Sequence, residues 1–279
     1  MGSGPASLTL TFGFGASFFD RVGLATARPE ALAPLPAFPD DQLDPARGGG
    51  ALFVQIAADD PLAGLHALAH GEAPGARRGE DPLGEVQVHH RAGARPYRTQ
   101  APQPRGTARR HRQPLPRRRS RAGPDPRDRP GSPPWPAGGS YVVVRRIRML
   151  LDHWDTLPGG GEHTAPDLTA HCPDGVPVIA RNAHIRPTAR GTNGGATMLR
   201  RGSSYYDRLR ADGTPDAGML FVAWQSGPRT GFVPVRQRLA RGDALGRYPV
   251  HEASSLFVVP GGVRPGGHAG QALLEDAPQ

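Results

Sequence analysis

Residues 139–150, GSYVVVRRIRML, decide the fold, because a glycine turn leads into a run rich in β-branched residues. Such a run favours a β-strand over a helix. Three later stretches have the same character: ATMLRR at 196–201, AGMLFVAWQ at 217–225 and SSLFVVP at 254–260. The part of the chain after residue 135 therefore predicts four short strands.

Helical patterns are fewer. In GFVPVRQRLARGDAL, residues 231–245, Phe232, Val235 and Leu239 fall on one apolar stripe of a helix. Residues 7–70 begin with an alternating stretch, SLTLTF, which is followed later by a short apolar run, ALFVQIA. They end in a predicted helix with Asp60 as its N-cap and Pro61 at its first position. Short strands, few helices and frequent turn signals predict an antiparallel α+β fold.

A basic block at residues 73–134 separates these two parts. It holds 15 arginines against 5 acidic residues and 12 of the 32 prolines, and every basic residue of the chain is arginine. The block has too little apolar surface to order itself, so we expect disorder. One alternative is a basic nucleic-acid-binding arm. Its only aromatic residue, Tyr97, gives little support for stacking on bases.

Several common kinds of site are excluded or weakly indicated. Cys172 is the single cysteine, so an internal disulfide and a cysteine-based zinc site are excluded. The spacing of Cys172 with its neighbouring histidines matches no common zinc pattern: His153, His163 and His171. GFGASFF at 13–19 lacks the third glycine of a dinucleotide fingerprint and is interpreted as a loop. No apolar run is long enough to span a membrane.

A set of motifs in matching order carries a family resemblance. LTLTFGFGASFFDRVGL (8–24), AGGSYVVVRRIRMLLDHWD (137–155), NAHIR (182–186) and MLRRGSSYYD (198–207) together resemble the dye-decolourising (DyP-type) haem peroxidases, with the exported, iron-uptake-associated branch nearest. The resemblance covers residues 7–70 and 135–270. It implies two ferredoxin-like halves with antiparallel sheets, of the dimeric α+β barrel type. We expect an incomplete N-terminal half at 1–72, the basic block at 73–134 and a haem-binding half at 135–275.

The resemblance also implies a cofactor and residue roles. His184 would be the axial ligand of haem b, and Arg200 would lie on the distal face and act on hydrogen peroxide. Arg190 and Phe221 would be further haem contacts, although the spacing of Phe221 alone favours a core position. On residue type alone, His184 would more often be an ordinary polar histidine, and Arg200 and Arg201 surface charges.

The implied partners are hydrogen peroxide and a reducing substrate such as a dye. No specific nucleic acid is expected, and a homo-oligomer stays open. The family branch suggests a periplasmic or extracellular protein exported by the twin-arginine route, although the first 20 residues lack a secretory signal. A haem-carrying or iron-handling protein without turnover is the remaining alternative.

The family's acid–base motif, G-x-x-D-G-T, is missing from this sequence. It would fall within the basic block. When the codons permitted by residues 97–114, YRTQAPQPRGTARRHRQP, are read one base further along, they allow TGRKPRNLVGLHDGTANP. We therefore interpret the block as a catalytic segment read in a shifted frame, and we expect impaired peroxidase activity.

Overall fold

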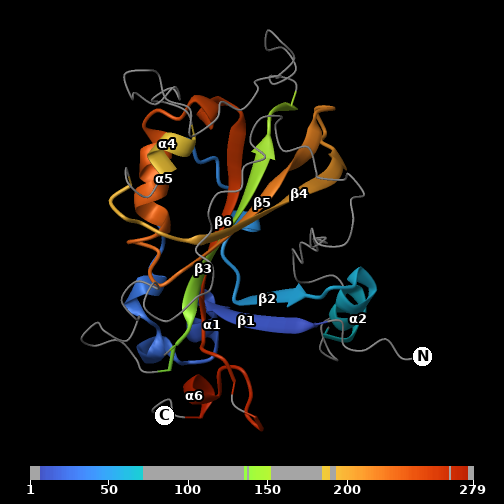
Figure 1. The fold of residues 1–279 in the computed structure, drawn as a ribbon, viewed down its shortest axis with the longest axis vertical. Coiled ribbons are helices and arrows are strands. Elements are labelled where there is room, and N and C mark those ends of the chain that lie inside the picture. The colour runs from blue at the N-terminus through green and yellow to red at the C-terminus, as the bar shows by residue number, and fades with distance from the viewer. Residues whose placement is uncertain are drawn as a thin grey trace, which may run out of the picture.

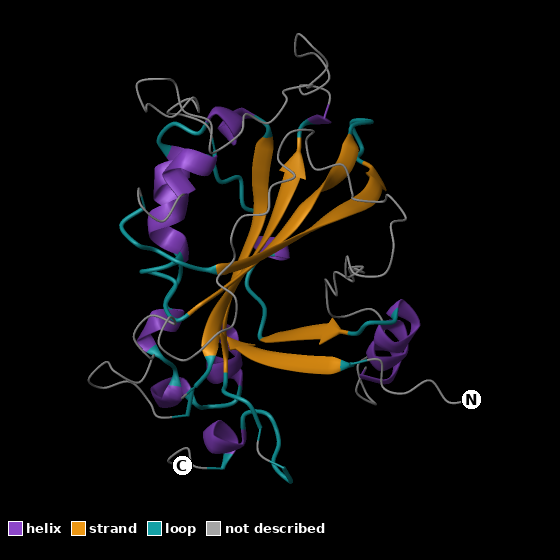
Figure 2. Ribbon diagram, in the orientation of Figure 1, coloured by secondary structure: helices purple, strands orange, loops and turns teal. Residues whose placement is uncertain are grey.

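The computed structural model describes residues 7–71, 135–136, 138–151, 184–188, 193–263 and 265–275. Six antiparallel strands form one sheet in the order β2-β1-β6-β3-β5-β4. The sheet is strongly curved, and short helices lie around it (Figure 1, Figure 2). This confirms the predicted antiparallel α+β class.

The strands predicted after residue 135 are all present. They are β3 (Ser140–Met149), β4 (Leu199–Leu209), β5 (Pro215–Gln225) and β6 (Pro249–Val259). β3 pairs with both β5 and β6, and its Val142 and Val143 have no exposed surface. β6 begins before the predicted SSLFVVP run, because Val250 and His251 also pair with β3.

β1 (Thr9–Gly15) and β2 (Leu52–Ala57) form an antiparallel pair that runs across one end of the sheet (Figure 1). β1 joins β6 through the pairs Phe14 with Val258 and Gly15 with Phe257. The loop predicted at 13–19 is wrong: β1 continues through Gly15, and α1 (Ala16–Arg21) follows directly. A Cβ on Gly15 would lie 2.0 Å from the carbonyl oxygen of Gly50, so the glycine permits close backbone approach within the strand.

The helix predicted after Asp60 is α2 (Pro61–Gly71), and the Asp60 carboxylate accepts a hydrogen bond from the Leu62 amide at 2.9 Å. The second predicted helix is α5 (Phe232–Ala240). The other described helices are short: α4 (Ile185–Thr188), α6 (Gln271–Leu274), η1 (Ala25–Ala27), η2 (Glu30–Leu32), η3 (Pro45–Arg47) and η5 (Ala244–Arg247).

α5 covers one face of the sheet. Phe232 and Val233 are buried against Val143 of β3, and the Phe221 and Phe232 ring centroids are 6.2 Å apart. Leu239, the third member of the predicted stripe, is half-buried. Packing of this apolar helix face fixes α5, and the shorter α4 that it contacts, on this side of the sheet (Figure 1).

A second cluster ties the N-terminal segment to the strand that follows the basic block. Trp135 packs against Phe14 and Phe19, and its indole nitrogen donates to the Ala27 carbonyl at 2.9 Å. The N-terminal elements are therefore packed against the rest of the sheet. The proposed domain boundaries at 72 and 134 stay a prediction.

Some predictions fall outside the described residues. These are the basic block at 73–134 and the histidines and cysteine weighed as a zinc site: His153, His163, His171 and Cys172. Within the described ranges, none of the helices has the length and hydropathy to cross a membrane. The same ranges contain no group of three or more metal-ligating side chains.

Candidate functional site

The sheet face under α5 carries the predicted arginine. Arg200 of β4 pairs with Ala223 of β5, and Gly202 pairs with Phe221. Because paired residues in an antiparallel sheet point to the same face, Arg200 and Phe221 share the face against which α5 packs. The structure therefore brings these two predicted residues together on one side of the sheet.

Burial lowers the pKa of Arg200 from its ordinary value. A guanidinium is too weak an acid to lose its proton at neutral pH, so Arg200 keeps its positive charge. A charge with little surrounding water acts more strongly on a nearby negative group than a solvated charge does. Arg200 is thus a fixed positive charge with little water around it.

His184 directly precedes α4. Its Nδ1 lies 2.5 Å from Oδ2 of Asp243, whose side chain is 6% exposed. When Nδ1 donates to this carboxylate, the lone pair of the neutral imidazole is on Nε2. A carboxylate partner on the second nitrogen is the arrangement that orients histidine ligands and strengthens them as donors to metals.

Asp243 is held in place by its own backbone surroundings. Its Oδ1 accepts from the Leu245 amide at 3.0 Å and caps η5, and its amide donates to the Leu239 carbonyl at the end of α5. The orientation of His184 is therefore set by the C-terminal end of α5. Sequence reasoning did not identify Asp243, although the GDAL stretch just after the predicted helix has the pattern of an N-cap.

The turn after α4 is also fixed. The buried side chain of Asn193 donates from Nδ2 to the carbonyls of Thr188 and Ala196, at 3.3 and 2.8 Å. The Thr188 hydroxyl donates to the His184 carbonyl at 3.2 Å. Because β4 begins shortly after Ala196, this side chain links the helix that follows His184 to the strand that carries Arg200.

A buried charged cluster lies beneath α5 on the same face. Arg145 of β3 is 2.6 Å from Asp41, and Arg236 of α5 is 2.7 Å from Asp40. Burial and the neighbouring charges of Arg145 and Arg236 lower the pKa of His251 to about 2. His251 is therefore neutral over the whole physiological range, and the cluster holds α5 to the segment before β2.

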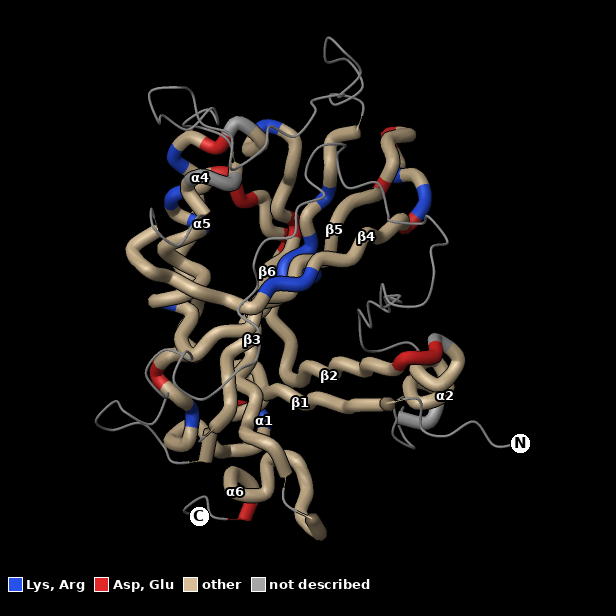
Figure 3. Tube along the Cα trace, in the orientation of Figure 1, with Lys and Arg blue, Asp and Glu red and all other residues tan. Residues whose placement is uncertain are grey.

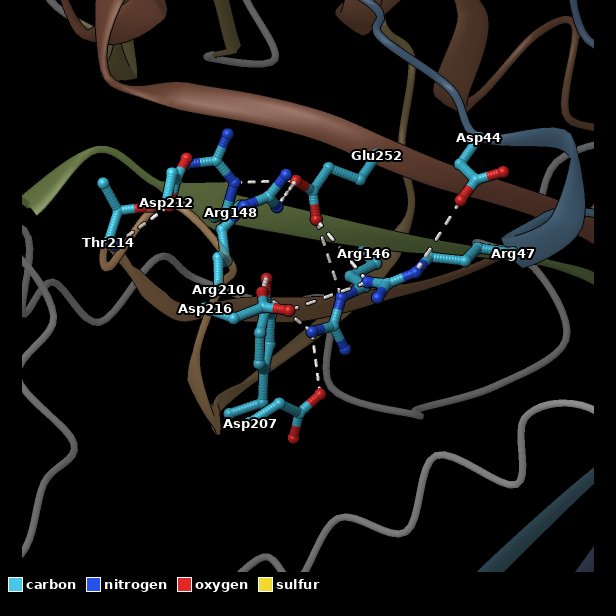
Figure 4. A network of polar contacts seen from close by, with 11 residues as sticks. Asp44, Arg47, Arg146, Arg148, Asp207, Arg210, Asp212, Thr214, Asp216 and Glu252 are labelled. Carbon is cyan, nitrogen blue, oxygen red and sulfur yellow. Dashed lines mark hydrogen bonds and ion pairs between the residues drawn. The ribbon is translucent and has the colours of Figure 1, made fainter.

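The opposite face has a separate network of ion pairs (Figure 4). Arg146 lies 3.0 Å from Asp216 and 2.7 Å from Asp207, and Glu252 accepts from Arg148 and Arg210 at 2.6 and 2.8 Å. These residues join β3, β4, β5 and β6. Figure 3 shows basic and acidic positions both present along these central strands. The contacts hold neighbouring strands of the sheet together.

Arg190, the remaining predicted haem contact, lies outside the described residues. Taken together, the fold and the described residues define an antiparallel α+β protein with a histidine oriented by a buried carboxylate and an arginine on the sheet face under α5. This arrangement has the chemistry of a protein that holds a metal-containing cofactor through one imidazole.

Comparison with protein families agrees with this class. The model described as Dyp-type peroxidase, N-terminal, matches residues 2–73, and the model described as Dyp-type peroxidase, C-terminal, matches residues 126–264. Most of the basic block lies between the two matched ranges.

Known relatives cover nearly the whole chain. The dye-decolorizing peroxidase of Thermobifida fusca is 40% identical over 97% of this chain and 68% of its own length. The deferrochelatase of Escherichia coli K12 is 31% identical over 97% of this chain and 69% of its own. The solved structure of DtpA from Streptomyces lividans, as an oxyferrous/water mixed complex, has a TM-score of 0.73 and 42% identity to this chain. The structure of a DyP-type peroxidase from Streptomyces coelicolor has a TM-score of 0.73 and 41% identity. Each match covers 98% of this chain and 79% of the solved chain. The chain belongs to the Dyp-type peroxidase family.

Proposed function

We propose that this chain is a haem-dependent peroxidase that binds haem b through His184 and uses hydrogen peroxide to oxidise dyes or other reducing substrates. Family membership supports the activity, and the solved relatives described as ferric and oxyferrous DtpA support an iron porphyrin as the cofactor. The observation that carries the assignment to His184 is its 2.5 Å contact with the buried Asp243 carboxylate.

The residues present fit haem. A histidine would hold an iron porphyrin through a ring nitrogen that carries no proton, and when Nδ1 of His184 donates to Asp243, Nε2 is the nitrogen with the lone pair. Haem, when bound, supplies the redox-active iron at which peroxide is reduced by two electrons. The chain's own contribution on this side is to hold the ring of His184 in one orientation.

Arg200 is proposed to act on the peroxide. When the peroxide O–O bond breaks, the departing oxygen gains negative charge, and the guanidinium of Arg200 would stabilise that charge. The burial that lowers the pKa of Arg200 also removes competing water. Phe221 and Arg190 are proposed as haem contacts, and the ring contact of Phe221 with Phe232 supports an apolar wall on the Arg200 face.

Proton transfer is the weak step in this chain. The sequence has no G-x-x-D-G-T motif, so the aspartate that the resemblance assigns to acid–base catalysis is missing. A general acid–base group contributes about 10² to 10⁴ in rate. We therefore propose that water relays the proton here beside the fixed charge of Arg200, and that turnover is slower than in a chain with the aspartate by about this factor.

A second candidate is haem or iron handling without turnover. The comparisons support the peroxidase and do not support this alternative. The comparisons give no support to a nucleic-acid-binding function for residues 73–134. Export, and any assembly into oligomers, are proposed from the family branch alone, and fractionation of the native host and light scattering of the purified chain test them.

The experiment is a titration of the purified chain with hemin, followed by an assay of peroxide-dependent dye oxidation. A Soret band that saturates at one hemin per chain supports haem binding. Slow dye oxidation that is further reduced in Arg200→Leu supports the peroxidase. Haem binding with no dye oxidation would favour the candidate without turnover instead.

A further inference from the structure

Arg238 of α5 is half-buried, and one nitrogen of its guanidinium is shielded from solvent. Its Nη1 is shielded from solvent and has no hydrogen-bond partner, and no carboxylate lies within ion-pair distance in the described ranges. Arg236, two residues earlier on the same helix, contacts both Asp40 and Asp41. Because a shielded guanidinium nitrogen is costly unless it is hydrogen-bonded, the surroundings of Arg238 suit an anion that the described residues do not supply.

The position of Arg238 relates it to the proposed haem site. A Cβ built on Gly194 would lie 3.6 Å from Nη2 of Arg238, so the guanidinium lies against the turn that follows α4. Asn193 fixes this turn by its bonds to Thr188 and Ala196. Further along the chain from Arg238, Asp243 binds the imidazole of His184. Near the end of α5, Arg238 thus contacts the turn at Gly194, and Asp243 contacts His184 at the start of α4.

We propose that Arg238 binds a propionate carboxylate of haem b. This inference rests on the proposed function, in which His184 holds that haem. Haem b has two propionate groups, so it brings carboxylates with it when it binds. A guanidinium offers a planar pair of N–H donors that matches a carboxylate, and such charged hydrogen bonds are stronger than neutral ones.

The competing arrangement is internal. The buried Oδ1 of Asn193 also has no hydrogen-bond partner, and in this arrangement it pairs with Arg238, which lies against the adjacent Gly194. In that arrangement Arg238 would hold the turn and would not contact the cofactor. The two arrangements differ in one measurable respect, because only the first depends on negative charge on the porphyrin.

The test compares hemin with hemin dimethyl ester, in which both carboxylates are blocked. The affinity of each porphyrin is measured by Soret titration for the natural chain, Arg238→Gln and Arg241→Gln. Arg241 is an exposed arginine at the end of the same helix, so Arg241→Gln removes the same charge and side chain as Arg238→Gln. We expect the natural chain and Arg241→Gln to bind hemin more tightly than the ester. We expect Arg238→Gln to reduce that preference by about tenfold or more, as for loss of a charged hydrogen bond.

Equal weakening of hemin and ester binding in Arg238→Gln would overturn the proposal and favour the pairing with Asn193. If Arg238→Gln does not fold, the natural chain and Arg238→Lys, which keeps the positive charge, decide the question. If the natural chain or Arg238→Lys binds hemin no more tightly than the ester, the proposal is overturned. A natural chain that binds no hemin at all would refute the proposed function and this inference together. Hemin binding that needs His184 but shows an unchanged preference in Arg238→Gln would refute this inference alone.

Discussion

Replacing Asp243 by asparagine tests how the chain controls His184. The Asp243 carboxylate accepts from His184 Nδ1 at 2.5 Å through Oδ2 and from the Leu245 amide at 3.0 Å through Oδ1. An asparagine can keep the second bond, because its amide oxygen can still cap η5. The substitution therefore removes mainly the negative charge beside the imidazole.

The size of the effect follows from burial. The Asp243 side chain is 6% exposed, so water screens its charge weakly. Loss of a partner that orients a metal-binding histidine costs about 10- to 100-fold in affinity, which is about 1.4 to 2.8 kcal/mol. We expect hemin affinity to fall within this range. We also expect the ferric–ferrous midpoint potential to rise, because the carboxylate stabilises the more positive ferric state.

The assay is a hemin titration with spectroelectrochemistry. Asp212→Asn is the matched control, because Asp212 also accepts a backbone amide two residues on, from Thr214 at 2.9 Å, but is exposed and in the turn between β4 and β5. The control should leave both quantities unchanged. If Asp243→Asn changes hemin affinity by less than twofold and leaves the potential unchanged, then Asp243 does not act on the haem ligand.

The remaining predictions concern stability and repair. His251 is neutral in the folded chain with a pKa of about 2, below the ordinary value of about 6.5. The unfolded state therefore binds more protons as pH falls below 6.5, and the stability contributed by His251 should decrease by up to about 1.4 kcal/mol per pH unit between roughly pH 6 and 3. Urea titrations should show that the free energy of unfolding depends less on pH in His251→Gln than in the natural chain. An equal pH dependence in the two chains would contradict the assignment. Phe232→Ala should lower the free energy of unfolding by about 3 to 5 kcal/mol, since the ring packs against Phe38 and Phe221, whereas a loss below about 1 kcal/mol would mean that α5 does not fix this face. Replacing residues 97–114 by TGRKPRNLVGLHDGTANP should raise the rate of dye oxidation by about 10² to 10⁴ if the missing aspartate limits it, and no gain in a folded, haem-binding chain would contradict that cause.

The elements with a strong local pattern were predictable from the sequence. The β-branched run at 139–150 became β3, and the stripe containing Phe232 and Val235 became the buried face of α5. GFGASFF was misread because glycines in a loop and glycines at a close strand contact look alike in one dimension. Only the approach of Gly50 to Gly15 distinguishes them.

The candidate site was predictable in part. His184 and Arg200 were selected by the resemblance, and the register of β4 with β5 places Arg200 on the same face as Phe221. Asp243 and Arg238 could not be assigned from sequence, because their roles depend on how the end of α5 meets the segment after His184. A pairing across 59 residues leaves no periodic signal in the chain.

The most direct test of the central claim is chemical rescue of the proposed iron ligand. His184→Gly is mixed with hemin, with and without added imidazole, and the Soret band and the electron paramagnetic resonance spectrum are recorded beside those of the natural chain. We predict that the natural chain shows a ferric haem with one histidine ligand, that His184→Gly loses this signature, and that free imidazole restores it. A signature that is unchanged in His184→Gly without imidazole would show that the haem is held elsewhere and would contradict the account.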